Sequence, residues 1–363
     1  MKIRVIHVIT TIDLGGAEKQ LLTLATCQKE MGLDVEVIYL KGRPALLNDF
    51  LAAGIRVNSE FSSLNLYQQV RKLSMMRSSK NQVFHAHLPR AELLCSLSLS
   101  TDSFIVTRHN TEQFFPKAPK IISMLLSRFV LGKAFCSISI SKAVADFLKS
   151  SFELPSSSIN HVIYYGLPKK QNSYKELKSN RLKSLRIGTI ARHVHQKNIP
   201  LLLETFKKLF EIEFFDGNLF IVGSGPLTGE LKALSENLGI KQSVKWIDQI
   251  KDVEEFYQSL DIFILTSHYE GFGLVLLEAM QQGIPIVARK IPAISEVLGE
   301  DHPGLLDSTN PSDFASTILK IVKNRKLLQE CVSYQYTRLD AFFIDNAEIA
   351  HRKLYQHLLV GRK

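Results

Sequence analysis

Short apolar runs alternate with longer amphipathic stretches along almost the whole 363-residue chain, and they fall into two series. Apolar runs of this kind are typical of strands covered on both faces, whereas a period near 3.6 residues indicates helices. Their alternation predicts parallel sheets with helices on both faces. The predicted strands are residues 3–9, 35–40, 83–86, 104–107, 134–140 and 161–165 in the first series, and residues 185–190, 219–222, 244–246, 262–265 and 286–288 in the second.

The two series predict an α/β protein with two doubly wound domains. A hydrophobic fraction of 45% over 363 residues is enough for two separate cores. Between the series lies a polar stretch without apolar periodicity, which predicts a linker. The predicted organisation is an N-terminal domain (1–165), a basic linker (166–184), a second domain (185–340) and a terminal helix (341–363).

Positive charge is concentrated in the first half of the chain. Residues 1–165 hold 19 Lys and Arg against 12 Asp and Glu, and residues 166–185 hold six against one. A basic surface can bind nucleic acid or an anionic membrane, or serve solubility alone. Nucleic acid is not predicted, because no aromatic and basic residues interleave as in a nucleic-acid module.

The stretch 117–133 favours a membrane, since its apolar residues share one side of a helix and its basic residues lie elsewhere. The plainer alternative is a surface helix whose apolar side faces the core. The apolar residues are Ile121, Ile122, Leu125, Phe129 and Val130, and the basic ones are Lys117, Lys120, Arg128 and Lys133.

Three features predict a cytoplasmic protein. The N-terminal apolar run leads into Asp13 and two glycines without a cleavage pattern, so it is predicted to be a strand and not a signal peptide. The apolar segment 121–140 contains Arg128 and Lys133, which makes it a poor membrane span. The four cysteines have no C-x-x-C spacing and suit a reducing compartment.

Two carboxylates flank a Gly-Phe-Gly turn directly after the predicted strand 262–265. The stretch 268–278 has the sequence His-Tyr-Glu-Gly-Phe-Gly-Leu-Val-Leu-Leu-Glu, and a helix is predicted from Leu274. Such a turn presents backbone N–H groups at a helix N-terminus, where an anion is stabilised. Glu270 and Glu278 can accept hydrogen bonds from hydroxyls, so the pattern indicates a phosphate flanked by polyol. Taken alone, it also fits an ordinary turn before an amphipathic helix.

Other turns follow predicted strands. Gly15 and Gly16 lack the G-x-G-x-x-G spacing, so no dinucleotide fingerprint is present. Arg192 and Lys197 lie on the loop after residues 185–190, where two cations can neutralise a diphosphate or simply be solvated. Gly223 starts another turn, which permits a close approach to a ligand or only a tight bend.

Together these motifs resemble the retaining glycosyltransferases of the GT-B fold, the glycosyl transferases group 1 family. The resemblance rests on residues 270–278, 283–288, 15–18, 107–110 and 139–141 and covers nearly the whole chain. It implies two Rossmann-like domains facing a cleft, with the last helix crossing back to the N-terminal domain. It also implies a role in bacterial-type surface or lipid-linked polysaccharide synthesis, such as lipopolysaccharide or capsule.

The resemblance assigns roles to individual residues. Arg192 and Lys197 would bind the donor diphosphate, Glu278 the ribose, and Glu270 would face the transferred sugar. His109 would lie beside the reacting centre, so the implied catalytic residues are His109, Arg192, Lys197 and Glu270. The remaining implied contacts are Gly16, Gly223, Gly271, Phe272, Gly273 and Leu274 on the donor side, and His85, His87 and Asn110 on the acceptor side.

The implied reaction is metal-independent transfer from a UDP- or GDP-sugar to a saccharide or lipid-linked saccharide, at the inner face of the membrane. No cofactor is expected, and no Asp-x-Asp cation anchor is present. His85 and His87 alone suggest a metal, but no third ligand has suitable spacing. The alternatives are a nucleotide-sugar epimerase of similar fold and a non-catalytic nucleotide-sugar-binding protein.

Four positions depart from the family pattern. Ala191 and Asn198 stand on either side of the cationic loop where glycines are common. Ser224 occupies a position that is frequently acidic, and Asp248 replaces a glycine near Trp246 in the region expected to meet the base. The identity of the base is therefore where the resemblance is weakest.

Overall fold

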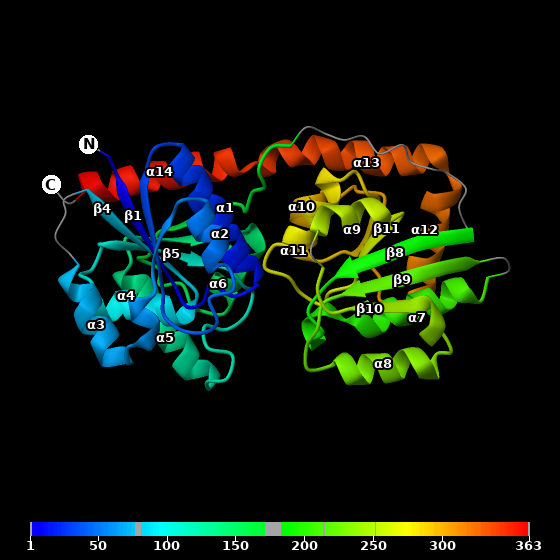
Figure 1. The fold of residues 1–363 in the computed structure, drawn as a ribbon, viewed down its shortest axis with the longest axis horizontal. Helices are drawn as coiled ribbons and strands as arrows, with labels where there is room; N and C mark the ends of the chain where they lie inside the picture. The colour runs from blue at the N-terminus through cyan, green and yellow to red at the C-terminus, as the bar shows by residue number, and fades with distance from the viewer. Residues whose placement is uncertain (1, 77–80, 171–182, 213–214, 251, 362–363) are drawn as a thin grey trace. The chain divides into compact units, whose positions relative to one another are not determined.

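The computed structural model describes residues 2–76, 81–170, 183–212, 215–250 and 252–361. The chain divides into an N-terminal unit, residues 1–169 with 342–363, and a C-terminal unit, residues 170–341 (Figure 1). Each unit contains one parallel sheet with helices packed on it, so the predicted pair of Rossmann-like α/β domains is confirmed. Most of the predicted linker, residues 171–182, lies outside the described residues.

The N-terminal unit has a seven-stranded sheet in the order β3-β2-β1-β4-β5-β6-β7. All its neighbouring strands pair in parallel. The order changes direction between β1 and β4, and ligands of such sheets bind at the carboxyl ends of the strands near this switch point. The strands are β1 (Arg4–Ile9), β2 (Asp34–Tyr39), β3 (Arg56–Asn58), β4 (Gln82–His87), β5 (Phe104–Arg108), β6 (Cys136–Ser139) and β7 (Asn160–Val162).

Helices cover both faces of this sheet because its strands alternate two apolar sets. Val5 and Val83 belong to a cluster with residues of α1, α2 and α14, whereas Ile6 and Phe84 belong to a cluster with residues of α3, α4 and α5. The helices are α1 (Gly16–Glu30), α2 (Leu47–Ala52), η1 (Glu60–Ser63), α3 (Leu66–Met75), α4 (Pro89–Ser98), α5 (Lys120–Lys133), α6 (Lys142–Ser150) and α14 (Ile344–Val360).

The last helix packs on the N-terminal unit, although it follows the C-terminal unit in sequence (Figure 1). It contacts α1 and β4. Ile344, Leu354 and Leu358 are buried in the same cluster as Val5. A bridge between Leu167 and Phe343 joins the chain just before the C-terminal unit to the chain just after it.

The C-terminal unit has a six-stranded parallel sheet in the order β10-β9-β8-β11-β12-β13, with its switch point between β8 and β11. Its strands are β8 (Lys183–Ile190), β9 (Asp216–Val222), β10 (Val244–Ile247), β11 (Ile262–Leu265), β12 (Ile286–Arg289) and β13 (Leu305–Leu306). Its helices are η2 (His195–Lys197), α7 (Ile199–Phe210), α8 (Thr228–Asn237), η3 (Lys241–Ser243), α9 (Val253–Ser259), α10 (Leu274–Gln281), α11 (Pro292–Leu298), α12 (Pro311–Lys323) and α13 (Arg325–Leu339), followed by η4 (Asp340–Phe342).

Helix α5 exposes its apolar side to solvent. Ile121 is 68% exposed, and Ile122, Leu125 and Phe129 are exposed as well. The residues buried on α5 are Ser123, Ser127, Val130 and Leu131. The alternative of a core-facing apolar side is therefore wrong for four of the five predicted residues, and Val130 was wrongly placed among them because it belongs to the buried side.

Among the residues that the structure describes, none of the helices combines the length and the apolar character that a membrane crossing requires.

Candidate functional site

The carboxyl ends of β8 and β11 bring a buried ion pair together at the switch point of the C-terminal unit. Lys197 Nζ lies 2.6 Å from Glu270 Oε1, and Ser267 Oγ donates a hydrogen bond of 2.7 Å to the same oxygen. The Lys197 side chain is 15% exposed and that of Glu270 is 6% exposed. The attraction between the two charges is stronger than in a surface pair, because little solvent screens it, and it offsets the desolvation cost of burying both groups.

The loop that carries Lys197 is fixed by the end of β11. The Thr266 hydroxyl donates to the carbonyl of Asn198 at 2.9 Å, and the amide of His268 donates to the carbonyl of Gln196 at 2.8 Å. Asn198 has φ of 45°, in the left-handed region. Asparagine tolerates that region better than most residues, so Asn198 can replace the family's glycine there.

The Gly-Phe-Gly turn leads into α10 as predicted. Gly273 is the N-cap, with φ of 95°, and no side chain caps the helix. The first helical residue is Leu274, and Gly271 and Phe272 are buried beside Glu270. This helix terminus therefore presents backbone N–H groups and a partial positive charge beside the Lys197–Glu270 pair.

Glu278 lies on α10 and is held by a tyrosine that sequence analysis did not identify. The hydroxyl of Tyr257, on α9, donates a hydrogen bond of 2.9 Å to Glu278 Oε2. Burial and the neighbouring Glu278 charge raise the pKa of Tyr257 well above its ordinary value. Tyr257 therefore stays protonated and orients the carboxylate.

Two further residues predicted for the donor site lie in loops that follow strands of the C-terminal unit. Arg192 follows β8 and is exposed. Gly223 has φ of 127°, and a Cβ atom there would lie 2.2 Å from the carbonyl oxygen of Ala191. The fold of the unit itself therefore requires glycine at position 223. The ring of His193 packs edge-to-face against the ring of Trp246, with 5.4 Å between the ring centroids. This is the region that was expected to contact the nucleotide base.

In the N-terminal unit, Gly16 begins α1 directly after the turn that follows β1. A Cβ atom at Gly16 would meet no atom within 4 Å. Packing of the described residues does not explain a glycine at this position. Asn110 follows β5 and is exposed.

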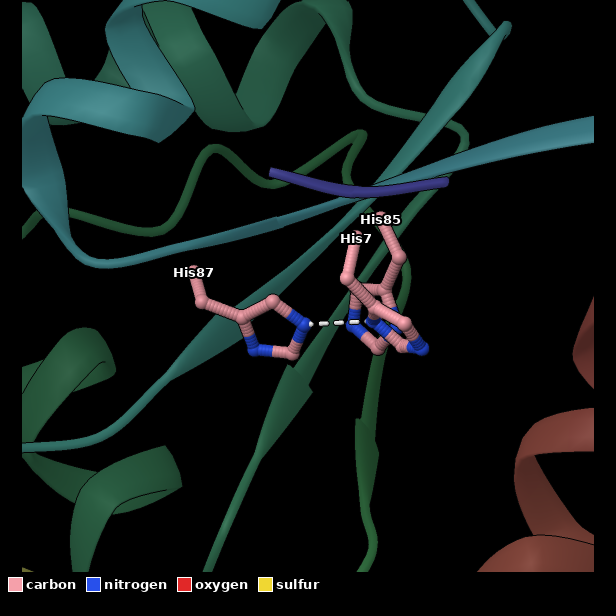
Figure 2. Close-up of side chains that lie close together, drawn as sticks. All are labelled: His7, His85 and His87. Atoms are coloured by element: carbon pink, nitrogen blue, oxygen red, sulfur yellow. Dashed lines mark hydrogen bonds between the residues drawn. The ribbon is translucent and has the colours of Figure 1, made fainter. Parts of the chain in front are cut away.

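Three histidines meet at the switch point of the N-terminal unit, and sequence spacing revealed only two of them. His7 of β1 joins His85 and His87 of β4, so that one nitrogen from each lies within 4.8 Å of the others (Figure 2). His7 is the third potential ligand that spacing did not find, because it comes from a strand 78 residues earlier. The register that pairs His7 with His85 and Ile9 with His87 brings them to one face.

These histidines are buried and already have protein partners. His85 is 0% exposed, and its Nδ1 and Nε2 lie 2.8 Å from the Tyr355 hydroxyl and 2.7 Å from Thr107 Oγ1. Burial lowers the pKa values of both His85 and His87 well below that of an ordinary histidine. Neither His85 nor His87 exposes its ring in this unit, and their predicted acceptor-side role stays a prediction.

His109 lies just after β5 and is hydrogen-bonded on both sides of its ring. Its Nε2 lies 3.2 Å from His87 Nδ1, and its Nδ1 is hydrogen-bonded to the Tyr165 hydroxyl. Burial and the Arg108 charge lower the pKa of His109 to about 3. A cavity of about 20 Å³, enough for about one water molecule, is lined by His87, His109, Tyr165 and His351 among others.

Two family profiles match the chain in succession. Residues 14–169 match Glycosyltransferase Family 4, and residues 171–338 match Glycosyl transferases group 1. The second match contains Arg192, Lys197, Glu270 and Glu278, and the first contains Gly16 and His109. The boundary between the two matches coincides with the boundary between the two compact units.

Curated relatives share parts of the chain. An uncharacterized glycosyltransferase of Haemophilus influenzae is 33% identical over 42% of this chain and 44% of its own length. The O-antigen biosynthesis glycosyltransferase WclY of Escherichia coli is 30% identical over 49% of this chain and 50% of its own. The matched part of the chain thus spans about half the length of these relatives.

A solved structure shares the whole fold. Anabaena HepE, in complex with UDP-glucose, aligns with a TM-score of 0.80 over 98% of this chain and 99% of its own, at 17% sequence identity. At that identity the likeness concerns the fold alone. The two profiles between them match residues 14–169 and 171–338, so the N-terminal unit is similar to Glycosyltransferase Family 4 and the C-terminal unit is similar to Glycosyl transferases group 1.

Proposed function

We propose that this protein is a retaining glycosyltransferase that moves a sugar from a nucleotide-diphosphate sugar to a saccharide or lipid-linked saccharide at an anionic membrane surface. The observation that carries the proposal is the Lys197–Glu270 pair beside the uncapped N-terminus of α10. A cation and a helix N-terminus can bind a diphosphate, and a carboxylate can accept hydrogen bonds from the hydroxyls of the attached sugar.

In this proposal the donor diphosphate binds Lys197, Arg192 and the amides of Gly271 to Leu274. Lysine has three N–H donors, so Lys197 can bind a phosphate oxygen while it keeps its bond to Glu270. Gly223 permits the close packing of the loops that carry these groups. Glu278, oriented by Tyr257, accepts hydrogen bonds from the ribose hydroxyls.

The proposed reaction retains the anomeric configuration. The bond between the anomeric carbon and the diphosphate oxygen breaks, and a bond to the acceptor oxygen forms on the same face. The acceptor proton passes to the departing diphosphate oxygen, so no protein base is needed. Lys197 and Arg192 stabilise the negative charge that develops on the diphosphate.

The pairing of Glu270 supports this route over a covalent glycosyl-enzyme. One Glu270 oxygen is bonded to both Lys197 and Ser267, and a carboxylate stabilised in this way is a weaker nucleophile. In the proposal Glu270 instead orients the transferred sugar through its hydroxyls. His109 and the Gly16 amide also contact the donor, and His87 and Asn110 lie toward the acceptor.

We propose further that the reaction needs no metal ion, because protein cations take the place of a divalent ion at the diphosphate. Adding EDTA should then leave activity unchanged. Loss of activity with EDTA and its recovery with Mg²⁺ or Mn²⁺ would contradict this part of the proposal.

Two similar proteins support the substrate classes. HepE was solved with UDP-glucose, and WclY is named for O-antigen biosynthesis. On this basis we propose that the donor is a UDP- or GDP-sugar. We propose that the product is a precursor of a surface polysaccharide, of the lipopolysaccharide or capsule type.

Donor binding tests the proposal directly. A panel of UDP- and GDP-sugars is added to the purified protein, and its melting temperature is measured. A ligand at 100 times its dissociation constant stabilises a protein by about 2.7 kcal/mol. The donor should raise the melting temperature of the wild-type protein and of Lys208→Ala, which removes an exposed lysine in the same unit. The shift should be lost in Lys197→Ala, and no shift with any nucleotide sugar or diphosphate would refute the donor site.

Acceptor dependence separates this function from its alternatives. A transferase releases nucleoside diphosphate only when an acceptor is present, apart from slow hydrolysis. An epimerase changes the donor without an acceptor, and a binding protein releases nothing. Epimer formation from the donor alone, detected by NMR of the nucleotide sugar, would favour the epimerase.

Helix α5 is the proposed membrane contact. Its exposed apolar residues project beside the exposed Lys117 and Lys120. Phe152, which is 71% exposed, lies near the same helix, because Arg128 of α5 donates to its carbonyl oxygen. Apolar side chains flanked by lysines are typical of a surface that inserts into an anionic lipid interface.

Vesicle flotation tests this contact. The protein should float with vesicles that contain anionic lipid and not with zwitterionic vesicles. Replacing Ile121 and Leu125 with serine should abolish flotation, whereas Leu51→Ser should not, since Leu51 is similarly exposed on α2, over the other face of the sheet. Equal flotation of both variants would exclude α5 as the contact.

A further inference from the structure

Eight buried side chains in the N-terminal unit form one continuous hydrogen-bonded chain. It passes through four histidines and crosses from α1 and α14 to three neighbouring strands. Its consecutive members are Tyr165, His109, His87, His7, Gln28, Tyr355, His85 and Thr107, and each is at most 9% exposed.

Every histidine in this chain uses both ring nitrogens. A neutral imidazole has one N–H donor and one acceptor nitrogen, so the direction of one hydrogen bond fixes the direction of the next. The bonds on the His7 side measure 2.8 Å from His7 Nε2 to Gln28 Oε1 and 3.0 Å from His7 Nδ1 to His87 Nε2. The histidines therefore cannot choose their tautomers independently.

Gln28 is the link between the two arms of the chain. Its side-chain oxygen, Oε1, faces His7, and its side-chain nitrogen, Nε2, donates a hydrogen bond of 3.1 Å to the Tyr355 hydroxyl. One group accepts and the other donates, so the chain runs from His7 through Gln28 to Tyr355. It continues in the same direction to His85 when the Tyr355 hydroxyl proton, whose oxygen accepts from Gln28, is donated to His85 Nδ1. With this amide orientation, His7, His87 and His109 carry their protons on Nε2, the Tyr355 hydroxyl donates to His85 Nδ1, and His85 carries its proton on Nε2 as well.

We propose that Gln28 is a positioning residue that couples the tautomers of the four histidines, so that His109 presents one fixed, neutral tautomer. Gln28 does not touch His109 but acts through His7 and His87. The proton arrangement follows from hydrogen bonds in the N-terminal unit alone, and only its importance for catalysis rests on the proposed function of His109.

A metal ion bound by His7, His85 and His87 is the competing interpretation of the same cluster. All six ring nitrogens of these residues already have hydrogen-bond partners, namely Gln28, Tyr355, Thr107, His109 and each other. A metal ion bound by one nitrogen of each histidine would have to break at least two of these bonds, because His7 Nδ1 and His87 Nε2 share one. The hydrogen-bonded chain therefore explains the cluster better.

NMR of the full protein labelled with ¹⁵N in histidine tests the proposal, because the nitrogen shifts distinguish Nδ1–H from Nε2–H. His351 is an internal control, since its Nδ1 donates to the Ala347 carbonyl at 2.7 Å and that oxygen can only accept. We expect Nε2–H for His7, His85, His87 and His109, and Nδ1–H for His351. Opposite tautomers for His85 and His109 in the wild-type protein would overturn the coupling.

Two variants distinguish coupling from local effects. Gln28→Met removes both hydrogen bonds at similar size, so His85 and His109 should no longer share a single tautomer, while His351 is unchanged. Thr107→Val removes the acceptor of His85 Nε2–H, so His85 should switch to Nδ1–H, and His7, His87 and His109 should switch with it. A switch of His85 alone, or an unchanged His109 in Gln28→Met, would refute the proposal.

A final measurement adds ZnCl₂ to the labelled wild-type protein. The histidine signals should not change at equimolar zinc. Metal-induced shifts of His7, His85 and His87 in the wild-type protein, with those of His85 and His87 lost in His7→Gln, would show a metal site and overturn the hydrogen-bonded arrangement. None of these measurements needs a donor, so they can fail while the proposed function stands, and the reverse also holds.

Discussion

The two units have the same strand order around their switch points but place opposite chemistry there. At the β1–β4 edge, buried neutral histidines satisfy one another through hydrogen bonds. At the β8–β11 edge, Lys197 and Glu270 form an ion pair beside a glycine turn. Burial favours neutral forms unless a partner of opposite charge is supplied. The same topology can therefore hold a fixed neutral network in one unit and a site for an anion in the other.

The largest expected difference between the two edges is their response to acid. Burial lowers the pKa of His7 and His351 from 6.5 to about 4. The unfolded chain binds protons on these rings near pH 6.5 and the folded unit does not, so the free energy of unfolding should fall as pH drops from 6.5 toward 4. Each such histidine contributes about 1.4 kcal/mol per pH unit in that range.

Hydrogen exchange of peptides at pH 7.5 and pH 5.5, corrected for intrinsic rates, measures this loss separately in each unit. Peptides from β4 and α14 should lose protection at pH 5.5, and peptides from β11 and α10 should lose less. Glu92 of α4 opposes this trend. Burial raises its pKa, so as pH falls the folded unit binds a proton on Glu92 before the unfolded chain does. Equal losses in both units would show that the histidine cluster does not dominate the acid response.

Lys197→Ala should give the largest effect on activity. It removes the cation at the proposed diphosphate site and leaves Glu270 buried without its partner. A fall in kcat/KM of about 10²-fold is expected, which corresponds to about 2.7 kcal/mol. Lys208→Ala is the matched control, since Lys208 forms an exposed pair with Glu211. Wild-type kinetics in Lys197→Ala would remove the ion pair from the mechanism.

Glu278→Ala should have a smaller effect, because ribose hydroxyls bind the carboxylate without taking part in bond breaking. We expect donor binding or turnover to weaken about tenfold, equivalent to about 1.4 kcal/mol. Isothermal titration with the donor and steady-state kinetics provide the measurement. Glu230→Ala, on the exposed side of α8, is the control and should bind the donor normally.

Gly16→Ala should give the smallest effect and the clearest contrast between the units. The added Cβ meets no atom within 4 Å, so the melting temperature should not fall. If the Gly16 amide contacts the donor, the donor dissociation constant should rise several-fold. Gly223→Ala is the opposite case, since its Cβ collides with the Ala191 carbonyl and should destabilise the protein without any donor. An unchanged donor affinity in Gly16→Ala would remove Gly16 from the donor site.

Sequence patterns predicted the long central elements well and the short edge elements poorly. The strand at 262–265 has the predicted limits, and the helix after the glycine turn begins at Leu274 as predicted. β3 and β13, with three and two residues, were missed because so few residues show no periodicity. Of the candidate site, the residues on one loop or turn were identified. Tyr257, Gln28 and His7 were missed, because each meets its partner through strand register or helix packing. Ser267 was missed although it lies only three residues before its partner Glu270.

The sequence by itself determined the alternation of strands and helices, the glycine turn at α10 and the cations of the loop after β8. These features are local, since a few neighbouring residues encode a period or a backbone angle. Tertiary structure decided which groups are charged and which faces are open. Burial makes the histidines neutral, pairing places Lys197 against Glu270, and the packing of Val130 and Leu131 turns the other apolar residues of α5 outward. Charge state and exposure depend on what lies across the fold, and local sequence does not specify that.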